Sequence, residues 1–491
     1  MTETTRIDQE IAIAESELED LEVKRAETLA KISSLKAKRS QLIHGNTSSG
    51  EHSVTSLSPR QEKIRLFRSL FRGREDVFPR RFESKKTGKS GYQPVCRKEW
   101  IRGICRKPKI KCHDCESRDF VPVTDEVIES HLVGRDVTSK RSKRDYTIGV
   151  YLLLQDETCW FLAVDFDKEE WIDDVAVYMD TCNTYNVPAI LERSRSGDGG
   201  HVWIFFVEPV SAGLARQLGA FMLTEAMEKR PDIGFDSYDR FFPSQDTIPR
   251  GGFGNLIALP LQKKPREEGN SVFLDERFVP YPDQWAFFSS IKRMTRSEVE
   301  AVVNQAPTRC GILGVRMVAT DEHDTEPWFD PPSRYGKALP LSGPLPKRVE
   351  LVLGNQIYVK KKILPPGLKN RLIRLAAFQN PESYKAQAMR FPTFDKPRII
   401  HCCEDFPKYI GFPRGCLEEV VSLLESLGIK TVLKDERFEG RQIDIKFQGM
   451  LRREQEKAVE ALLKHDTGVL SASTAFGKNS GCLFFDCREA S

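Results

Sequence analysis

Apolar and polar positions follow two different periods between residues 146 and 261. Five apolar runs have the length of buried strands: residues 147–154, 160–166, 188–192, 202–207 and 256–261. Two longer stretches, residues 171–185 and 211–229, instead repeat their apolar side chains at helical spacing. Strands interleaved this closely with two helices predict a compact α+β sheet domain.

The N-terminal residues 5–43 are charged and have a helical pattern. Their apolar side chains approximate a heptad repeat, although Arg25 and Arg39 fall on the same seam. We expect a coiled coil over residues 1–44, through which the chain could self-associate; a single amphipathic helix packed on its own chain is the alternative. Residues 45–60 include Gly45-Asn46-Thr47-Ser48-Ser49-Gly50 and predict a flexible linker.

The composition fits several soluble domains rather than one. A chain of 491 residues is too long for a single ordinary core, and this one is 40% hydrophobic and 30% charged. No apolar run has the length of a membrane span, and the N-terminus has no apolar signal segment. We therefore expect a cytoplasmic location and no membrane partner.

Positive charge is concentrated in residues 60–111, although the whole chain carries a formal net charge of only +4. Phenylalanine and tyrosine side chains are interleaved with the arginines and lysines of this stretch. Such a stripe could follow a polyanion backbone and stack bases, which predicts contact with nucleic acid. A solvated basic face with its aromatic side chains in a core is the alternative.

Four of the twelve cysteines fall close together in or just after this stretch: Cys96, Cys105, Cys112 and Cys115. Cysteines of a cytoplasmic protein are reduced, so a cluster suggests metal rather than disulfides. Four thiolates can close a tetrahedral structural Zn²⁺ site, and His113 could substitute for one sulfur. We expect a basic zinc-binding module over residues 61–122; four buried, reduced cysteines are the alternative.

Two acids stand one residue apart at the end of an apolar run, Phe161-Leu162-Ala163-Val164-Asp165-Phe166-Asp167. Alternate side chains of a strand share a face, so Asp165 and Asp167 are predicted to point the same way. Two such carboxylates offer hard oxygen ligands to Mg²⁺ or Mn²⁺, which can activate a hydroxyl and stabilise a leaving pyrophosphate. Two exposed acids at a strand end are the alternative.

A glycine-rich loop connects the next two predicted strands: Ser194-Arg195-Ser196-Gly197-Asp198-Gly199-Gly200-His201. Gly197, Gly199 and Gly200 would let backbone N–H groups approach phosphate oxygens closely. Arg195 and His201 would add side-chain donors to the same phosphates. A tight hairpin with an incidental histidine is the alternative.

A third segment, residues 235–246, carries three acids that compete for the role of third metal ligand: Asp236, Asp239 and Asp246. Aspartates in such a context also cap turns. The segment precedes residues 251–260, a glycine-rich stretch that ends in a Leu-Pro strand.

Taken in order, the Asp-x-Asp strand end, the Ser–Gly-rich–His loop and the acid ahead of a Leu-Pro strand resemble the archaeo-eukaryotic primase superfamily. The sequences of these motifs are similar to those of the primase domains of TOTE conflict systems, and the resemblance covers residues 61–264. The resemblance implies an RRM-like catalytic sheet, which we assign to residues 123–306, that polymerises nucleotides on a template. It also implies a small zinc module beside that core.

The resemblance further implies a role for each matching position. Asp165 and Asp167 match the first-motif metal ligands, and Asp239 best matches the third-motif acid. Ser196 and His201 match the motif that contacts the phosphates of the incoming nucleotide. Lys263 lies where such enzymes often keep a basic residue, which predicts a further phosphate contact.

The end of the chain resembles the beginning of a superfamily 2 helicase motor. Residues 307–347 predict a linker, and residues 348–450 are similar to the region that precedes the motor in TOTE-type helicases. Within residues 451–491 the phosphate-binding loop would include Gly477 and Lys478, but Asn479 stands where a Mg²⁺-binding Ser or Thr would be. We expect an incomplete motor in which Lys478 is a relic, so that a separate helicase could be a partner.

Together these features predict a template-dependent DNA primase-polymerase of a bacterial conflict or mobile-element system. Its expected cofactors are Mg²⁺ or Mn²⁺ and Zn²⁺, its substrates are nucleoside triphosphates, and its template is single-stranded DNA or RNA. A metal-dependent nuclease and an inactive nucleic-acid-binding remnant are the alternatives. The glycine-rich loop with His201 and Lys263 fits a triphosphate better than a scissile backbone phosphate.

Overall fold

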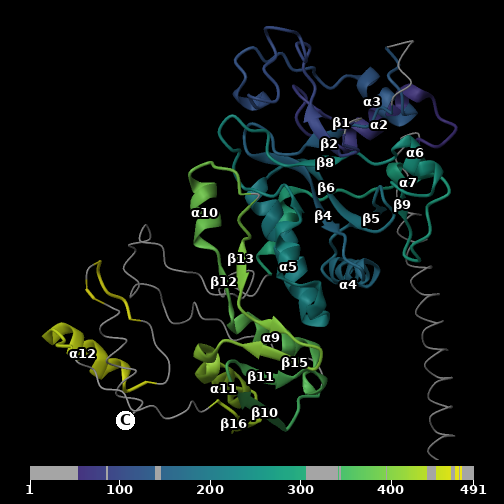
Figure 1. The fold of residues 1–491 in the computed structure, drawn as a ribbon. Helices are drawn as coiled ribbons and strands as arrows, with labels where there is room; N and C mark the ends of the chain where they lie inside the picture. Colours follow the sequence, from purple (N-terminus) through teal and green to yellow (C-terminus); the bar gives the residue numbers. More distant parts are fainter. Residues whose placement is uncertain are drawn as a thin grey trace, which may run out of the picture. The chain divides into compact units, whose positions relative to one another are not determined.

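A computed structural model describes residues 53–84, 87–138, 145–305, 341, 344–393, 395–438, 449–465, 470–474 and 476–477 (Figure 1). The chain divides into two compact units, residues 1–53 and residues 54–491, and the helices and strands given below belong to the second. The predicted coiled coil, part of both predicted linkers and Lys478 lie outside the described residues.

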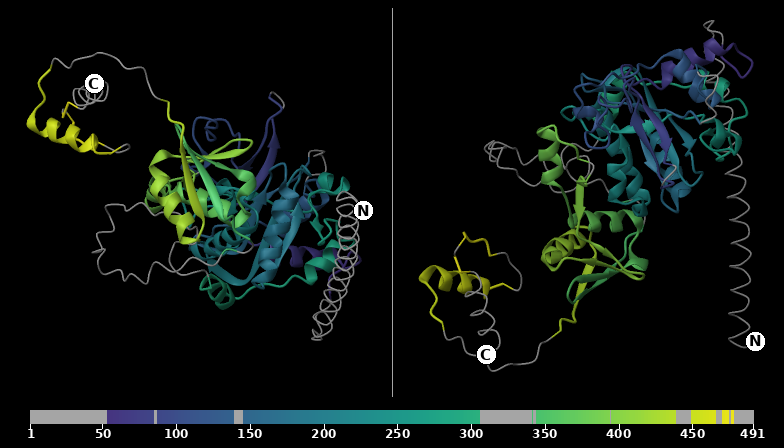
Figure 2. Two further views of the ribbon diagram at one scale, coloured as in Figure 1. Left: turned by 90° about the horizontal axis from the view of Figure 1, so that it is seen from below. Right: turned by 45° about the horizontal axis from the view of Figure 1, so that its top comes forward.

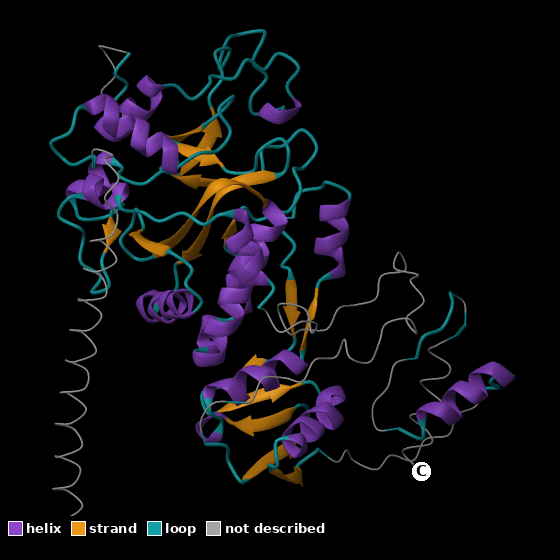
Figure 3. Ribbon diagram, turned by 180° about the vertical axis from the view of Figure 1, so that it is seen from behind, coloured by secondary structure: helices purple, strands orange, loops and turns teal. Residues whose placement is uncertain are grey.

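Five antiparallel strands form the central sheet in the order β7-β4-β6-β5-β9. Their bounds are β7 Phe241–Phe242, β4 Thr158–Phe166, β6 Gly200–Ser211, β5 Ala189–Arg193 and β9 Phe273–Leu274. Helices α4 (Trp171–Thr184) and α5 (Ala212–Lys229) pack against this sheet (Figures 1 and 3). The three longer strands and both helices confirm the elements expected here, and with them the α+β class.

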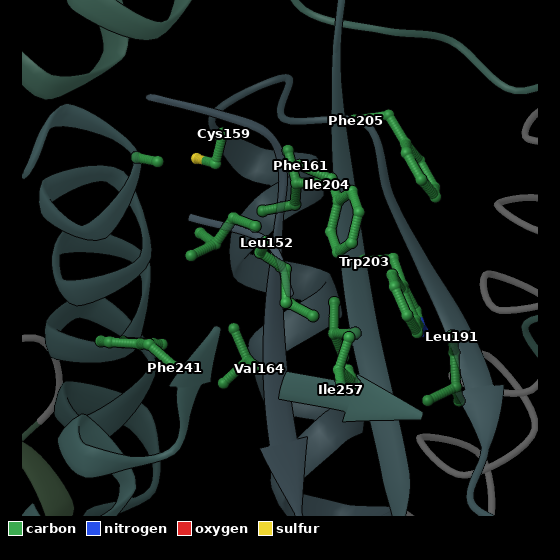
Figure 4. Packing of buried hydrophobic residues seen from close by; sticks show 14 of the residues in the cluster. Leu152, Cys159, Phe161, Val164, Leu191, Trp203, Ile204, Phe205, Phe241 and Ile257 are labelled. Carbon is green, nitrogen blue, oxygen red and sulfur yellow. The ribbon is translucent and has the colours of Figure 1, made fainter. Parts of the chain in front are cut away.

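The strand β4 is held by buried side chains on both of its faces. Phe161 packs on Trp203 of β6, with the ring centroids 5.1 Å apart (Figure 4). Phe166 packs on Tyr178 of α4, with the centroids 5.4 Å apart. Burying one large apolar side chain contributes about 1.5–3 kcal/mol, so a strand that is apolar on both faces is firmly anchored. The acids at the end of β4 therefore stand on a rigid support.

The N-terminal elements of this unit pack on the same core. Helix α2 (Arg60–Leu70) contributes Phe67, which is fully buried. The other elements before β4 are β1 (Pro79–Glu83), β2 (Ser90–Pro94), η1 (Cys112–Asp114), α3 (Asp125–Val133) and β3 (Gly149–Tyr151). The elements after α5 are η2 (Pro231–Ile233), η3 (Phe235–Asp239), β8 (Leu256–Ala258), α6 (Lys263–Glu267), α7 (Gln284–Ser289) and α8 (Arg296–Val303). β3 and β8 pair with each other, where strands were expected.

Buried His131 ties α3 to the β3–β8 ribbon. Its Nδ1 accepts a hydrogen bond from the backbone N–H of Ile148 (3.2 Å), so the ring proton is on Nε2, which donates to the carbonyl of Pro260 (2.8 Å). Burial lowers the pKa of His131 to about 4. The imidazole is therefore neutral and serves the fold.

A second sheet, with its own core, has the strand order β14-β15-β11-β10-β16 (Figure 2). Its strands are β14 Glu404–Asp405, β15 Tyr409–Phe412, β11 Ile357–Lys360, β10 Arg348–Leu353 and β16 Lys430–Asp435. Around it lie η6 (Lys361–Ile363), α9 (Pro366–Leu375), η7 (Arg414–Cys416) and α11 (Leu417–Ser426), and α12 (Arg453–Leu462) follows. None of the described helices combines the length and the apolar character that a membrane span requires.

One segment of the C-terminal half contacts the central sheet domain. It consists of β12 (Ala377–Gln379), α10 (Pro381–Ala388) and β13 (Ile399–His401), and we call it the β12–α10–β13 segment. The hydroxyl of Thr247 donates to the carbonyl of Gln387 (3.1 Å), and the N–H of Arg250 donates to the carbonyl of Arg390 (3.0 Å). These contacts bring the segment beside the loop that follows β7.

Candidate active site

Charged side chains of alternating sign form a row across one end of the central sheet. The antiparallel register pairs Glu192 of β5 with His201 of β6, and His201 with Asp165 of β4. On the other side of β4, the N–H of Asp165 donates to the carbonyl of Arg240 (3.1 Å). Directly paired residues of an antiparallel ladder lie on the same face, so carboxylate, imidazole, carboxylate and guanidinium follow one another in space.

Asp165 and Asp167 both contact one nitrogen of Arg240, in agreement with the prediction that they lie on a common face. Nη1 of Arg240 hydrogen-bonds Oδ2 of Asp167 and lies 3.6 Å from Oδ2 of Asp165. Burial raises the pKa of Asp165 and the neighbouring charge of Asp167 adds to this, while His201 and Arg240 oppose it. The two carboxylates of this acid pair therefore concentrate negative charge and together hold the guanidinium of Arg240.

Both ring nitrogens of His201 face carboxylates. Its Nδ1 is 3.1 Å from Oε2 of Glu192, and its Nε2 is 3.6 Å from Oδ1 of Asp165. Burial by itself lowers the pKa of His201, but Glu192, Asp165 and Asp167 outweigh this and raise it above its ordinary value. The imidazole is therefore able to carry a proton on each nitrogen and to donate toward the site.

The glycine-rich loop lies directly against the end of β4. A Cβ at Gly199 would stand 2.7 Å from the carbonyl oxygen of Phe166, so only glycine allows this approach. Gly197 has φ +88°, in the left-handed region, and the N–H of Ser194 closes the loop on the carbonyl of Gly199 (2.9 Å). The Ser196 hydroxyl accepts a hydrogen bond from the N–H of Asp198 (3.3 Å). The predicted loop and the acid pair are therefore neighbours, and Gly200 begins β6.

The two predicted cationic side chains, Arg195 of this loop and Lys263 of α6, each have a partner of their own. Arg195 donates through Nη1 to the side-chain oxygen of Gln262, and its Nη2 lies 3.8 Å from Asp145. Lys263, the next residue after Gln262, begins α6 and has its Nζ 3.4 Å from Glu267. Lys263 is half-exposed and remains available to a ligand.

Asp239 has a hydrogen-bond partner in the C-terminal half of the chain. Both of its carboxylate oxygens accept from the backbone N–H of Arg398, at 3.1 and 3.4 Å, and Arg398 precedes β13. Burial raises the pKa of Asp239 to about 7, although the charge of Arg216 opposes this. Asp236 pairs with Lys168 (2.8 Å), and Asp246 pairs with Arg216. The role of Asp239 as third ligand therefore stays a prediction from its motif.

The donor set at the sheet end suits a divalent cation in its chemistry. Two carboxylates already surround one positive group, the guanidinium of Arg240, and carboxylate oxygens are the ligands that Mg²⁺ and Mn²⁺ prefer. In the part of the chain that the structure describes, no group of three Asp, Glu, His or Cys side chains stands in a metal-binding arrangement. Among the described residues, therefore, no third side chain completes a metal-binding group with Asp165 and Asp167.

The four predicted zinc ligands line a common cavity. Cys96, Cys105, Cys112 and Cys115 all border it, together with Lys107. The Cys96 sulfur accepts from the N–H of Asp119 (3.4 Å). Burial raises the pKa of Cys112, while Lys107 opposes the shift. The four cysteines share one cavity, but among the described residues they do not stand in a metal-binding arrangement, and the zinc site stays a prediction.

Two further residues were not predicted for the site. Glu192 is the penultimate residue of β5, and Arg240 follows Asp239; only the pairing of strands brings them to His201 and the acid pair.

At the C-terminal end, Gly477 has φ +81° and its carbonyl accepts from the side chain of Gln455 (3.3 Å). This contact gives the predicted phosphate loop a link to α12.

A family model described as the TOTE conflict system archaeo-eukaryotic primase domain matches residues 62–302. The match contains the whole row from Glu192 to Arg240, the glycine-rich loop and the four cysteines. It ends before β10, so the second sheet and the predicted helicase start lie outside it. No curated protein gives a significant sequence match.

Proposed function

Because residues 62–302 of this chain are an archaeo-eukaryotic primase domain of the TOTE conflict system family, we propose that the protein is a template-dependent DNA primase-polymerase. The family supports a nucleotidyltransferase role that involves nucleic acid and nucleotides. The observation that carries the proposal is the acid pair. Asp165 and Asp167 both contact the guanidinium of Arg240, beside a glycine-rich loop and next to His201.

In this proposal the two carboxylates hold Mg²⁺ or Mn²⁺. A divalent ion bound there supplies activation of the attacking hydroxyl and neutralises charge on the departing pyrophosphate. The chain's own residues do the rest. The backbone of Gly197 and Gly199 accommodates phosphate oxygens, and His201 donates to them through Nε2. Lys263 and Arg195 add positive charge beside the loop.

The proposed path of the template follows the basic N-terminal part of the domain. The guanidinium of Arg72 stacks over the indole of Trp160, 3.5 Å from the ring centroid. A cleft of about 260 Å³ beside it is lined by Arg72, Arg74, Gln155 and Trp160, among others. Cationic and aromatic side chains in one cleft suit the phosphates and bases of a single strand.

Nucleotide incorporation tests the proposal directly. The purified protein is incubated with a labelled nucleoside or deoxynucleoside triphosphate, a single-stranded template with and without a primer, and Mg²⁺ or Mn²⁺. We expect template-dependent extension that requires the divalent ion. Degradation of the template would favour a nuclease instead, and a mobility shift without chemistry would favour an inactive binding protein.

We also propose that the four cysteines hold one structural Zn²⁺. Elemental analysis of protein purified without chelator should then find about one zinc ion per chain. Replacing Cys112 and Cys115 together by serine should release it and unfold this region locally, since metal binding and folding are coupled. Cys159 and Cys182, which are buried away from the cavity, offer a matched control when each is replaced by alanine. Absence of zinc in the unmodified protein would exclude the zinc site.

A further inference from the structure

Glu192 is a carboxylate buried inside the central sheet domain. Only 2% of its surface is exposed, and it lies on a strand whose other positions are largely apolar. Burying a carboxylate is costly unless hydrogen bonds compensate it. Three donors do so here: Trp203 Nε1 (3.0 Å) and His201 Nδ1 (3.1 Å) reach Oε2, and the Ser271 hydroxyl (3.3 Å) reaches Oε1.

These contacts determine how the imidazole of His201 is oriented. The indole N–H of Trp203 can only donate, and an ionised carboxylate can only accept, so the proton between Oε2 and His201 belongs to Nδ1. Trp203 is fully buried and stacked on Phe205, with the ring planes 7° apart, so the indole is fixed. Glu192, held by that indole, therefore fixes the ring of His201 and leaves Nε2 toward Asp165.

We propose that Glu192 is a positioning residue of the active site: it holds His201 so that Nε2 is the atom that contacts the phosphates of a nucleoside triphosphate. The inference rests on the proposed function, because it assigns that ligand to the same site. Glu192 itself touches no substrate. It acts through one hydrogen bond, and its effect on nucleotide affinity passes through His201.

A double-mutant cycle with Glu192→Gln and His201→Ala tests this. Glutamine keeps the size of the side chain, but its neutral amide oxygen is a weaker acceptor than a carboxylate oxygen and holds Nδ1 of His201 less firmly. We expect the Kd for a fluorescent nucleoside triphosphate, and the KM in extension, to rise roughly tenfold in Glu192→Gln, with kcat little changed. In the His201→Ala background, Glu192→Gln should have no further effect.

Ser271→Ala is the matched control, because it removes a partner from the other carboxylate oxygen; we expect less than about a twofold change. If Glu192→Gln does not fold, Glu192→Asp, which keeps the charge but shortens the reach, enters the same cycle. An equal loss of nucleotide affinity from Glu192→Gln with and without His201 would show that Glu192 stabilises the fold and does not act through His201, which would overturn the inference.

The cycle separates this inference from the proposed function. Wild-type protein that binds the triphosphate without extending any template would overturn the polymerase proposal, while the Kd cycle still decides the role of Glu192. Wild-type protein that binds no triphosphate would overturn both.

Discussion

Two acidic regions of this molecule differ in what neutralises them. At the end of β4, Asp165 and Asp167 share the guanidinium of Arg240, a side chain at the edge of the same sheet. In residues 236–246, each acid has a hydrogen-bond partner of its own. Asp239 is bound to the backbone N–H of Arg398, which belongs to a part of the chain that lies outside the primase domain.

The difference concerns which carboxylates can exchange their cation. A side chain such as Arg240 can rotate away, so a divalent ion could take its place between Asp165 and Asp167 without disturbing the backbone. Asp239 is instead tied to a buried neighbour: Arg398, with 6% of its surface exposed, donates its backbone N–H to Asp239 and has its Nε 3.6 Å from Oδ1. We therefore expect the first region to exchange its cation, while the second joins the sheet domain to the β12–α10–β13 segment.

The largest expected effect separates the two regions by activity. Asp165→Asn and Asp167→Asn should each reduce kcat by on the order of 10³-fold, because loss of one metal ligand removes several kcal/mol of transition-state stabilisation. Asp239→Asn should stay within about tenfold of the wild type, since an amide oxygen still accepts from Arg398. Steady-state extension rates measure all three.

Asp180→Asn, an exposed acid paired with Lys229 on the surface, provides the matched control and should leave the rate unchanged. A loss in Asp239→Asn as large as that in Asp165→Asn would contradict the comparison. It would make Asp239 the third ligand that its motif predicts, and the Arg398 contact would then have to open during catalysis.

The same contrast explains how much the sequence predicted. The period of two along β4 was enough to place Asp165 and Asp167 on one face, and the order of apolar runs was enough to place the glycine-rich loop of residues 194–200 between two strands. Both signals are local. The α+β class was likewise predictable, because it depends on the order of strands and helices.

Partners that are distant in sequence could not be predicted in this way. Arg240 reaches Asp167 across 73 positions and Arg398 reaches Asp239 across 159, and neither pairing leaves a periodic pattern. Glu192 is only nine positions from His201, yet their contact depends on the register of β5 against β6. A single sequence does not fix strand register, since a shift by one residue would turn Glu192 to the other face.

A smaller effect is expected on the affinity of the acid pair for a metal ion, and it tests whether Arg240 competes with that ion. Arg240→Ala removes a positive charge that competes for the acid pair, so the protein should bind Mn²⁺ about tenfold more tightly. Arg398→Ala keeps its backbone N–H and should leave Mn²⁺ affinity unchanged. Titration of free Mn²⁺ by electron paramagnetic resonance gives both values. Equal Mn²⁺ affinities in Arg240→Ala and the wild type would show that the guanidinium does not occupy the metal position.

The smallest expected effect is on the pH dependence of stability, and it concerns Asp239. Burial raises its pKa from 3.8 to about 7, so the folded protein binds this proton more tightly than the unfolded chain does. The resulting stabilisation is complete below pH 4 and is lost as the pH rises through 7. Asp239→Asn, which does not titrate, should therefore lose less stability than the wild type between pH 5 and pH 8. Urea unfolding midpoints at the two pH values measure this difference.

His131 titrates in the opposite sense, because its pKa is lowered to about 4, but it is present in both proteins and its contribution cancels. An identical midpoint change in the two proteins would mean that Asp239 is ionised in the folded state, and its carboxylate would then be as available to a cation as the pair at the end of β4.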